Sequence, residues 1–314
     1  MDQPPARDGV AVVGSISADL TVFGSPLPRS GETVIADAFA ITLGGKGANQ
    51  ALAAVRAGVP TFLVGAVGDD LFRAITLDAL TAEGVDTAAV AVLDTSTGIA
   101  HIRVDSGTGE NDIAIVPGAN GQVTAAMATA RLRELAGRIG VVLLQLEIPV
   151  GTVLETARVA RELGCRVLLD PAPAQPLPDE LWPLVDVVTP NETEVEVLTG
   201  VRVDDSAAAV RAGRWFVQRG VGAAVVTMGE RGAVVVREAE ATSYPASAVT
   251  AVDTTAAGDA FTGSLGASLA RGETWTSAVE RALAAGALAV TVRGASPSLP
   301  TREQVDDFLT RNRR

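Results

Sequence analysis

The chain has 314 residues, of which 47% are apolar, 20% charged and 4% aromatic, and its formal net charge at pH 7 is −12. A single Cys and a single His exclude an internal disulfide and a zinc site built from Cys and His ligands. The acidic balance argues against a nucleic-acid groove, which needs a basic face, but does not exclude small anionic ligands.

Neither a membrane span nor a secretory signal is expected from the sequence. The longest uncharged stretch, residues 113–130, contains Pro117, Gly118 and Gly121, which disfavour a spanning helix. The first eight residues are polar and contain prolines, without an apolar segment of the kind that signal peptides have. We therefore expect a cytoplasmic protein with a flexible tail over residues 1–8.

Short runs of Val, Ile and Leu alternate with Ala- and Leu-rich amphipathic segments along most of the chain. This alternation predicts an α/β fold, with a mostly parallel sheet covered by helices on both faces. The predicted strands are residues 10–14, 62–67, 141–146, 167–170, 185–188 and 223–227. The predicted helices are residues 45–57, 71–83, 124–138, 151–163 and 207–219, and the chain after Asp253 is predicted to be almost wholly helical to Leu309.

Two stretches interrupt this alternation. Residues 20–43 carry turn residues between short extended runs, and residues 88–116 contain strand-like runs around Ser106–Gly109, a hairpin signal. Strands that cannot join a buried parallel sheet predict a small separate sheet, although edge hairpins would give the same pattern. His101 lies in the middle of one of these strands, which favours a structural role.

The motif Asp253–Asp259 precedes a predicted helix and is rich in small residues. Small residues at a helix start let an anion approach backbone N–H groups that have no partner within the helix. Asp259 in the first turn is then placed to take a proton from an attacking hydroxyl, and we expect its pKa to stay low there. A first-turn Asp that only complements the helix dipole has the same pattern.

The Gly-rich segment Gly44–Gln50 also precedes a predicted helix and holds the only Lys of the chain, Lys46. Glycines let the backbone approach a polar ligand closely, while Lys46 and Asn49 supply donors. The compact ammonium of Lys46 fits where a guanidinium fork does not. A turn with a solvated Lys is the alternative, and the spacing is not that of a Walker loop.

Three more segments follow predicted strands, at the edge where α/β sheets bind ligands. Thr189–Glu194 contains Asn191 and Glu194, which can help to place a hydrated magnesium ion but also have the spacing of a capping box. Residues 15–19 offer Ser17 and a carboxylate, Asp19, suited to paired sugar hydroxyls. Thr227–Gly232 ends a strand in a Gly turn that can line a nucleotide.

Together these segments resemble the ribokinase family of carbohydrate kinases, also called the PfkB type. The matching segments keep their order and spacing from about residue 9 to residue 309, which is far more specific than any one motif. They are residues 14–19, 28–34, 44–50, 68–70, 118–120, 145–147, 170–174, 189–194, 253–259 and 294–298.

The resemblance implies a ribokinase-like α/β domain over residues 9–310, with a β lid formed from about residues 20–43 and 88–116. It implies a homodimer made through that lid. It also implies ATP-dependent phosphorylation of the 5-hydroxyl of a small sugar, D-ribose, with Mg²⁺ and an activating monovalent cation such as K⁺.

Individual roles follow from the same resemblance. Asp259 is the expected base, and Ala256, Ala257 and Gly258 form the expected anion hole. The expected sugar-binding residues are Ser17, Asp19, Gly45, Lys46, Asn49, Glu147 and Asp259. The expected ATP-binding residues are Asn191, Thr227, Gly229, Gly232, Gly258 and Leu283. Glu194 is expected to bind Mg²⁺ through water, and Asp253, Thr255, Ala289, Val292, Gly294 and Ser298 to surround the monovalent cation, largely through backbone carbonyls.

Two residues depart from the family pattern. Ser17 stands where Asn is frequent, which leaves open a kinase of deoxyribose, of another pentose or hexose, or of a nucleoside. Leu283 stands where Asn or His often flanks the adenine, and indicates a more apolar base pocket. The lid has few aromatics beyond Phe23 and Phe39, which disfavours a nucleoside. A non-catalytic binding protein on this scaffold is disfavoured because Asp259 and its neighbours are present.

Overall fold

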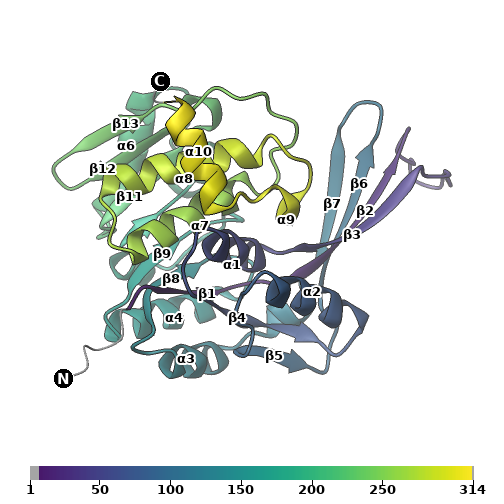
Figure 1. Cartoon of the computed structure of the whole chain (residues 1–314), viewed down its shortest axis with the longest axis horizontal. Helices are drawn as coiled ribbons and strands as arrows, with labels where there is room; N and C mark the ends of the chain where they lie inside the picture. The colour runs from purple at the N-terminus through teal and green to yellow at the C-terminus, as the bar shows by residue number, and fades with distance from the viewer. Residues whose placement is uncertain (1–6, 313–314) are drawn as a thin grey trace.

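In residues 7–312, which the computed structural model describes, nine strands form one large sheet (Figure 1). Its strand order is β13-β12-β11-β10-β9-β8-β1-β4-β5, and all neighbouring pairs from β11 to β5 are parallel. Only β12 and β13 are added antiparallel. The strands are β1 (Gly9–Val13), β4 (Thr61–Gly68), β5 (Val90–Leu93), β8 (Ile139–Leu144), β9 (Arg166–Leu169), β10 (Val187–Val188), β11 (Ala223–Thr227), β12 (Ala233–Arg237) and β13 (Ala241–Tyr244).

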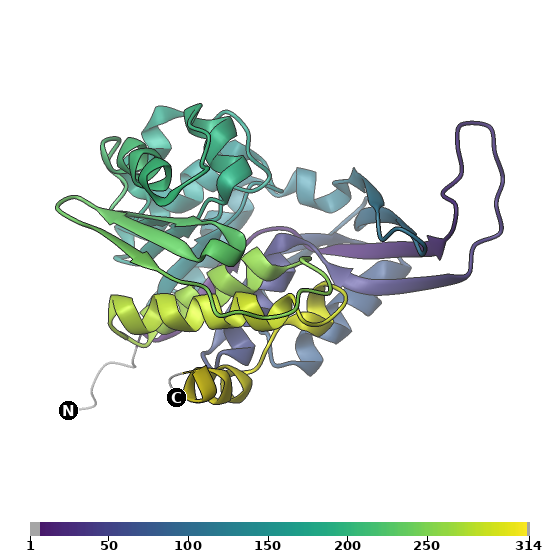
Figure 2. The same ribbon diagram turned by 90° about the horizontal axis from the view of Figure 1, so that it is seen from above.

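Helices cover both faces of this sheet, as the continuous apolar strands predict. In β1, Val10 and Val12 join one core cluster while Ala11 and Val13 join the other, because successive side chains point to opposite faces. Seen from above, the yellow C-terminal helices lie on one side of the sheet and α6 on the other (Figure 2). One face carries α1 (Lys46–Arg56), α2 (Leu71–Ala82), α7 (Ala257–Ala270), α8 (Trp275–Ala289) and α10 (Arg302–Asn312), and the other α3 (Ala125–Glu134), α4 (Val150–Glu162), α5 (Glu192–Thr199) and α6 (Ser206–Val217).

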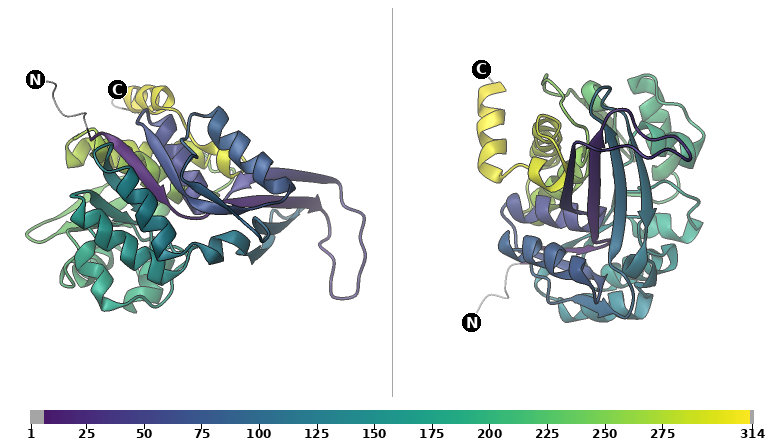
Figure 3. Two further views of the ribbon diagram at one scale, coloured as in Figure 1. Left: turned by 90° about the horizontal axis from the view of Figure 1, so that it is seen from below. Right: turned by 90° about the vertical axis from the view of Figure 1, so that its right-hand side faces the viewer.

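A second sheet projects from the large one and forms the lid (Figure 1; Figure 3, right). Its order is β3-β2-β6-β7, built from β2 (Ser17–Gly24), β3 (Ala38–Gly44), β6 (Gly98–Asp105) and β7 (Asn111–Val116). The predicted hairpin signal at residues 106–109 joins β6 to β7, which pair antiparallel. The prediction that the second excursion starts at residue 88 was wrong, because β5 pairs with β4 in the large sheet. His101 lies within β6, as expected.

The chain is anchored to the domain just before β1. Six residues of the predicted tail over residues 1–8 lie outside the described residues, but Arg7 is anchored: its Nη2 donates to the Leu163 carbonyl at 2.6 Å and its Nε to the Ile139 carbonyl at 3.2 Å. None of the helices within residues 7–312 combines the length and hydrophobicity of a membrane span.

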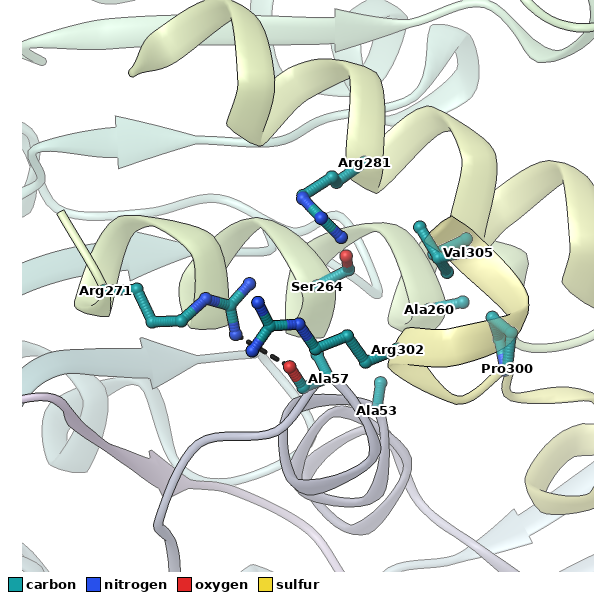
Figure 4. Close-up of a pocket in the computed structure, with 10 residues that line it drawn as sticks. Ala53, Ala57, Ala260, Ser264, Arg271, Arg281, Pro300, Arg302 and Val305 are labelled. Atoms are coloured by element: carbon teal, nitrogen blue, oxygen red, sulfur yellow. Dashed lines mark hydrogen bonds between the residues drawn. The ribbon is translucent and has the colours of Figure 1, made fainter. Parts of the chain in front are cut away.

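A chain of ion pairs links the end of α7 to α8 and α10, and Figure 4 shows the three arginines that belong to it. Glu273 accepts a hydrogen bond from Arg271 Nε at 2.9 Å and forms an ion pair with Arg281, whose Nε lies 3.2 Å away, and Arg281 also pairs with Asp306. Arg302 Nε lies 3.8 Å from Asp306 Oδ2. We call these five residues the arginine cluster. Arg271 also donates to the Ala57 carbonyl at 2.7 Å, which ties the cluster to the end of α1 (Figure 4).

Candidate active site

The predicted polar side chains meet where the carboxyl ends of the parallel strands face the first turns of α1 and α7. Glu147 and Asp170 follow β8 and β9 directly, while Lys46 opens α1 and Asp259 lies in the first turn of α7. The lid reaches this edge because Ser17 opens β2 and Gly44 ends β3. The sheet edge, two helix starts and the root of the lid thus form one site.

Asp259 is 4% exposed, and side-chain amides hold both of its oxygens. Asn49 Nδ2 donates to Oδ2 at 3.0 Å, and Gln50 Nε2 donates to Oδ1 at 3.1 Å. Burial raises the pKa of Asp259 above its usual value, although the charge of Lys46 and the two amides act in the opposite direction. The expectation of a low pKa was therefore wrong. A carboxylate with a raised pKa is a better proton acceptor.

The start of α7 has the features of an anion-binding turn. Ala256, the N-cap, has φ 59°, and it is the one non-glycine residue with a positive φ in the described part of the chain. A Cβ built on Gly258 would meet nothing within 4 Å, so open space lies beside that backbone. The Ala257 N–H, however, donates to the Thr254 carbonyl at 3.3 Å. Ala256 and Gly258 are thus the better placed of the three predicted anion-hole residues.

Asp19 is a lid carboxylate that faces the same site. Ser17 Oγ donates to its Oδ1 at 3.1 Å. Burial raises the pKa of Asp19 to about 6, and the charges of Glu147 and Asp259 add to this rise. A Cβ on Gly44 would lie 2.0 Å from Asp19 Oδ1, so only glycine allows this approach.

Glu147 and the Gly45–Lys46 turn meet beside Asp19. Glu147 Oε2 accepts from Ser15 Oγ at 2.5 Å and from the Lys46 backbone N–H at 2.9 Å. Gly45 has φ 89°, a conformation that favours glycine. The predicted sugar-binding residues Ser17, Asp19, Gly45, Lys46, Asn49 and Glu147 therefore lie around one site together with Asp259.

Lys46 lies between two buried carboxylates. Its Nζ is 3.6 Å from Asp170 Oδ2 and 3.9 Å from Asp259 Oδ1. Although burial opposes its charged form, these carboxylates together with Glu147 and Glu194 raise the pKa of Lys46. Burial raises the pKa of Asp170 to about 7, despite the nearby charge of Lys46.

Sequence reasoning gave no role to Gln50, Gln145 and Asp170, yet all three belong to the centre of the site. Gln50 Nε2 donates to Asp170 Oδ2 at 2.8 Å, and Gln145 Nε2 donates to Gln50 Oε1 at 2.6 Å. Two signals were available. Gln145 and Asp170 are polar residues directly after apolar strands, and Gln50 lies four residues after Lys46, on the same helix face. We call Lys46, Gln50, Asp170 and Asp259 the base cluster.

The predicted nucleotide residues lie partly together, next to the base cluster. Asn191 and Thr227 form a parallel β-bridge, and the Thr227 N–H donates to the Pro190 carbonyl at 3.0 Å. Gly232 has φ 87°, and a Cβ there would lie 2.0 Å from the Tyr244 carbonyl oxygen. Gly229 opens the short helical turn before it, with φ 54°. Leu283 lies on α8, which packs along α7, and its place beside an adenine stays a prediction.

Comparisons with known proteins agree with this geometry. Residues 7–302 match the pfkB family of carbohydrate kinases. The chain belongs to this family. The kinase is 38% identical to the ribokinase of Haemophilus influenzae, over 96% of this chain and 99% of that protein. It is 36% identical to the deoxyribokinase of Salmonella typhi, over 96% and 99%.

A solved structure of the same family agrees with the fold. The Arabidopsis thaliana ribokinase complexed with ribose and ATP superposes with a TM-score of 0.89 at 34% identity, covering 96% of this kinase and 98% of that chain. The ribokinase-like α/β architecture, with a large mostly parallel sheet and a separate small sheet, is thus confirmed.

Glu194 of the kinase fits an indirect role toward magnesium. Asn191 donates to both of its oxygens, from its backbone N–H at 2.8 Å and from Nδ2 at 2.9 Å, in a capping box. No group of three or more His, Cys, Asp or Glu within residues 7–312 is arranged to hold a metal ion. Mg²⁺ keeps several waters and binds few carboxylates, and the place of Glu194 beside such an ion stays a prediction.

The predicted cation loop of the kinase is organised by Asp253. Its carboxylate accepts from the Thr255 N–H at 2.9 Å, from Thr255 Oγ1 at 2.6 Å and from the Gly294 N–H at 2.8 Å. Although burial opposes it, these hydrogen bonds keep the pKa of Asp253 below its usual value. The Ala289 carbonyl accepts from the Val292 N–H at 3.1 Å, and Ser298 Oγ donates within α9 (Ala295–Ser298).

Proposed function

We propose that this kinase transfers the γ-phosphoryl group of ATP to the 5-hydroxyl of D-ribose. The observation that carries the proposal is the position of Asp259, buried beside the open anion-binding turn and held by Asn49 and Gln50. The similarity to ribokinases over nearly the whole chain, and to a structure complexed with ribose and ATP, supports it.

In this reaction the sugar hydroxyl attacks the γ-phosphorus. The new O–P bond forms as the bond to the leaving ADP oxygen breaks, and the hydroxyl proton passes to the Asp259 carboxylate. Backbone N–H groups at the start of α7 and the ammonium of Lys46 stabilise the negative charge of the transferred group. Phosphoryl transfer needs positioning and charge neutralisation more than covalent catalysis, so a chain with one His and one Cys suffices.

Two ions complete the proposal. Glu194, held by Asn191, would bind the water shell of Mg²⁺, and the ion would supply neutralisation of the negative charge on the nucleotide phosphates. A monovalent cation such as K⁺ is proposed at the loop that contains Asp253 and Thr255, together with Ala289, Val292, Gly294 and Ser298. The ionised Asp253 carboxylate supports this site. Because the proposed reaction consumes ATP, we propose that the enzyme works in the cytoplasm.

Deoxyribose is the second candidate substrate. The similarity to a deoxyribokinase nearly equals that to a ribokinase, and Ser17 already occupies one acceptor of Asp19. The test is kcat/KM for ribose, 2-deoxyribose, fructose and adenosine, with and without K⁺. Ribose is expected to be the best substrate. A preference of more than tenfold for 2-deoxyribose or adenosine contradicts the ribose assignment.

We also propose a homodimer through the lid, because one face of its sheet is apolar and exposed. The strand pairing places Phe39 and Ile41 of β3 opposite Val22 and Leu20, on the side away from Asp19. Phe39 is 60% exposed and Ile41 38%. Light scattering after gel filtration should give twice the chain mass, and Phe39→Lys should shift the protein toward monomer. A wild-type monomer at micromolar concentration contradicts the proposal.

A further inference from the structure

Two buried carboxylates share one ammonium and one amide beside the proposed reaction centre. Asp170 is 5% exposed and Asp259 is 4% exposed. Lys46 Nζ lies within 4 Å of both, and Gln50 Nε2 donates one hydrogen to each. The mechanism above uses Asp259 and Lys46 but leaves Asp170 without a role.

The orientation of the Gln50 amide is fixed by its other neighbour. Gln145 Nε2 donates to Gln50 Oε1 at 2.6 Å, so the Gln50 oxygen must accept and both hydrogens of Nε2 must point to the carboxylates. Gln145 itself is confined, because a Cβ on Gly14 would lie 1.9 Å from its Oε1. The Gln50 amide therefore links Asp170 to Asp259.

The charge of this cluster changes during the proposed reaction. Once Asp259 has taken the hydroxyl proton, it is neutral and no longer attracts Lys46. A buried ammonium without an ionic partner is costly, and Asp170, which is ionised above its pKa of about 7, supplies a second partner in that pH range. Without Asp170, Lys46 would pair more closely with Asp259 before the reaction, and this pairing would make the base weaker.

We propose that Asp170 is a positioning residue that holds Lys46 Nζ and the Gln50 amide beside Asp259 while the base gains and loses its proton. The inference rests on the proposed function, in which Asp259 is the base. Asp170 acts from the end of β9 through Lys46 and Gln50 and not by touching the sugar.

The pH dependence of turnover tests this role. Charged groups face the pair from several elements: Lys46 from α1, Glu147 after β8, Glu194 from α5 and Asp19 from β2. Asp170→Asn keeps an oxygen that can accept from Gln50 but removes one negative charge and frees Lys46 for Asp259. Both changes lower the pKa of Asp259.

The acid limb of the plot of kcat against pH should therefore move to lower pH by about 0.5–1 pH unit in Asp170→Asn. On the plateau, kcat should be several-fold lower than in wild type, and the KM for ribose should stay within about threefold of wild type.

A matched control is Asp186→Asn. Asp186 is an Asp that likewise lies next to a strand of the large sheet and is partly buried, but it accepts from the Val167 N–H and pairs with Arg161, outside the base cluster. Its pH profile should coincide with that of the wild type. If Asp170→Asn does not fold, Gln50→Met removes the amide link instead and should lower kcat at least tenfold with little change in ribose KM.

A readout that needs no turnover separates this inference from the proposed function. In protein labelled with ¹³C at the Asp carboxyls, the Asp259 signal is assigned by its loss in Asp259→Asn. It should titrate at lower pH in Asp170→Asn than in wild type, whichever sugar is the substrate. An unmoved titration and an unmoved acid limb overturn the role of Asp170. A raised KM with an unchanged kcat also overturns it, because Asp170 then acts on sugar binding.

Discussion

The two ends of the parallel pair α1 and α7 carry very different clusters of charge. At one end, the base cluster has one ammonium between two carboxylates that are each at most 5% exposed. At the other end, the arginine cluster alternates three guanidinium groups with two carboxylates, and Arg271 joins it to the end of α1. The same two helices thus join a cluster with one negative charge in excess to a cluster with one positive charge in excess, in which both carboxylates have cationic partners.

The pKa directions express this difference. Burial raises the pKa values of Asp19, Asp170 and Asp259, because too few cations compensate for it. In the arginine cluster, burial acts on Glu273 as well, but Ser277, Arg271 and Arg281 keep its pKa below the usual value. Glu273 of the arginine cluster finds enough ionic and hydrogen-bond partners within the fold. The active-site carboxylates do not, and a proton, a cation or a substrate can supply the missing partner.

The largest effect is expected from removing the base. Asp259→Asn keeps the size and shape of the side chain, but the amide cannot accept the hydroxyl proton. We expect kcat to fall by about 10²–10⁴-fold, measured as ATP-dependent sugar phosphorylation. Sugar binding, measured by calorimetry, should persist. Wild-type-like turnover in this variant would show that Asp259 is not the base.

The next largest effect concerns the stability of the protein without ligands. Asp19 and Asp170 have folded-state pKa values of about 6 and about 7, above the ordinary value of 3.8. Groups with raised pKa values favour folding below their unfolded pKa, and this contribution is lost as pH rises through 6–7. We therefore expect Tm to be about 2–5 °C higher at pH 5.5 than at pH 8. Asp170→Asn should reduce this difference, and a Tm that rises with pH contradicts the argument.

Glu273 of the arginine cluster acts in the opposite direction but in a different pH window. Its pKa is lowered from 4.5, so its stabilising contribution is present above that value and is lost only as pH falls below it. The comparison between pH 5.5 and pH 8 therefore reports mainly on the active-site carboxylates.

Much of the fold could be predicted from the sequence because the burial pattern is simple. Strands such as β11, predicted and observed at residues 223–227, are apolar on both faces. The β12–β13 pair was not predicted, and β5 was assigned to the lid. Strands at the edge of a sheet have weaker burial patterns: β13 is mostly exposed, and Val92 in β5 is 47% exposed.

The site was predictable in its members but not in its connections. Motif spacing indicated Asp259, Lys46 and Asn49, which the structure brings into contact. Gln50 of α1 contacts Gln145, which is 95 residues later in the chain, and Asp170, which is 120 residues later; these two residues follow β8 and β9. No pattern of neighbouring residues in the sequence predicts a contact over such a distance along the chain. The raised pKa of Asp259 was missed for a related reason, because burial is a property of the assembled fold.

The smallest effect is expected in the arginine cluster, and it falls on stability alone. Arg281→Met removes the guanidinium that joins Glu273 to Asp306 but keeps apolar volume. We expect the free energy of unfolding to fall by about 1–2 kcal/mol, between the values of exposed and buried ion pairs, with kcat unchanged.

Arg302→Ala is the matched control, because Arg302 Nε lies 3.8 Å from Asp306 and the Arg302 side chain is 49% exposed. It should cost at most about 0.5 kcal/mol. A loss of kcat in Arg281→Met at unchanged stability would show that the two ends of α7 are coupled, so that the arginine cluster acts on the base.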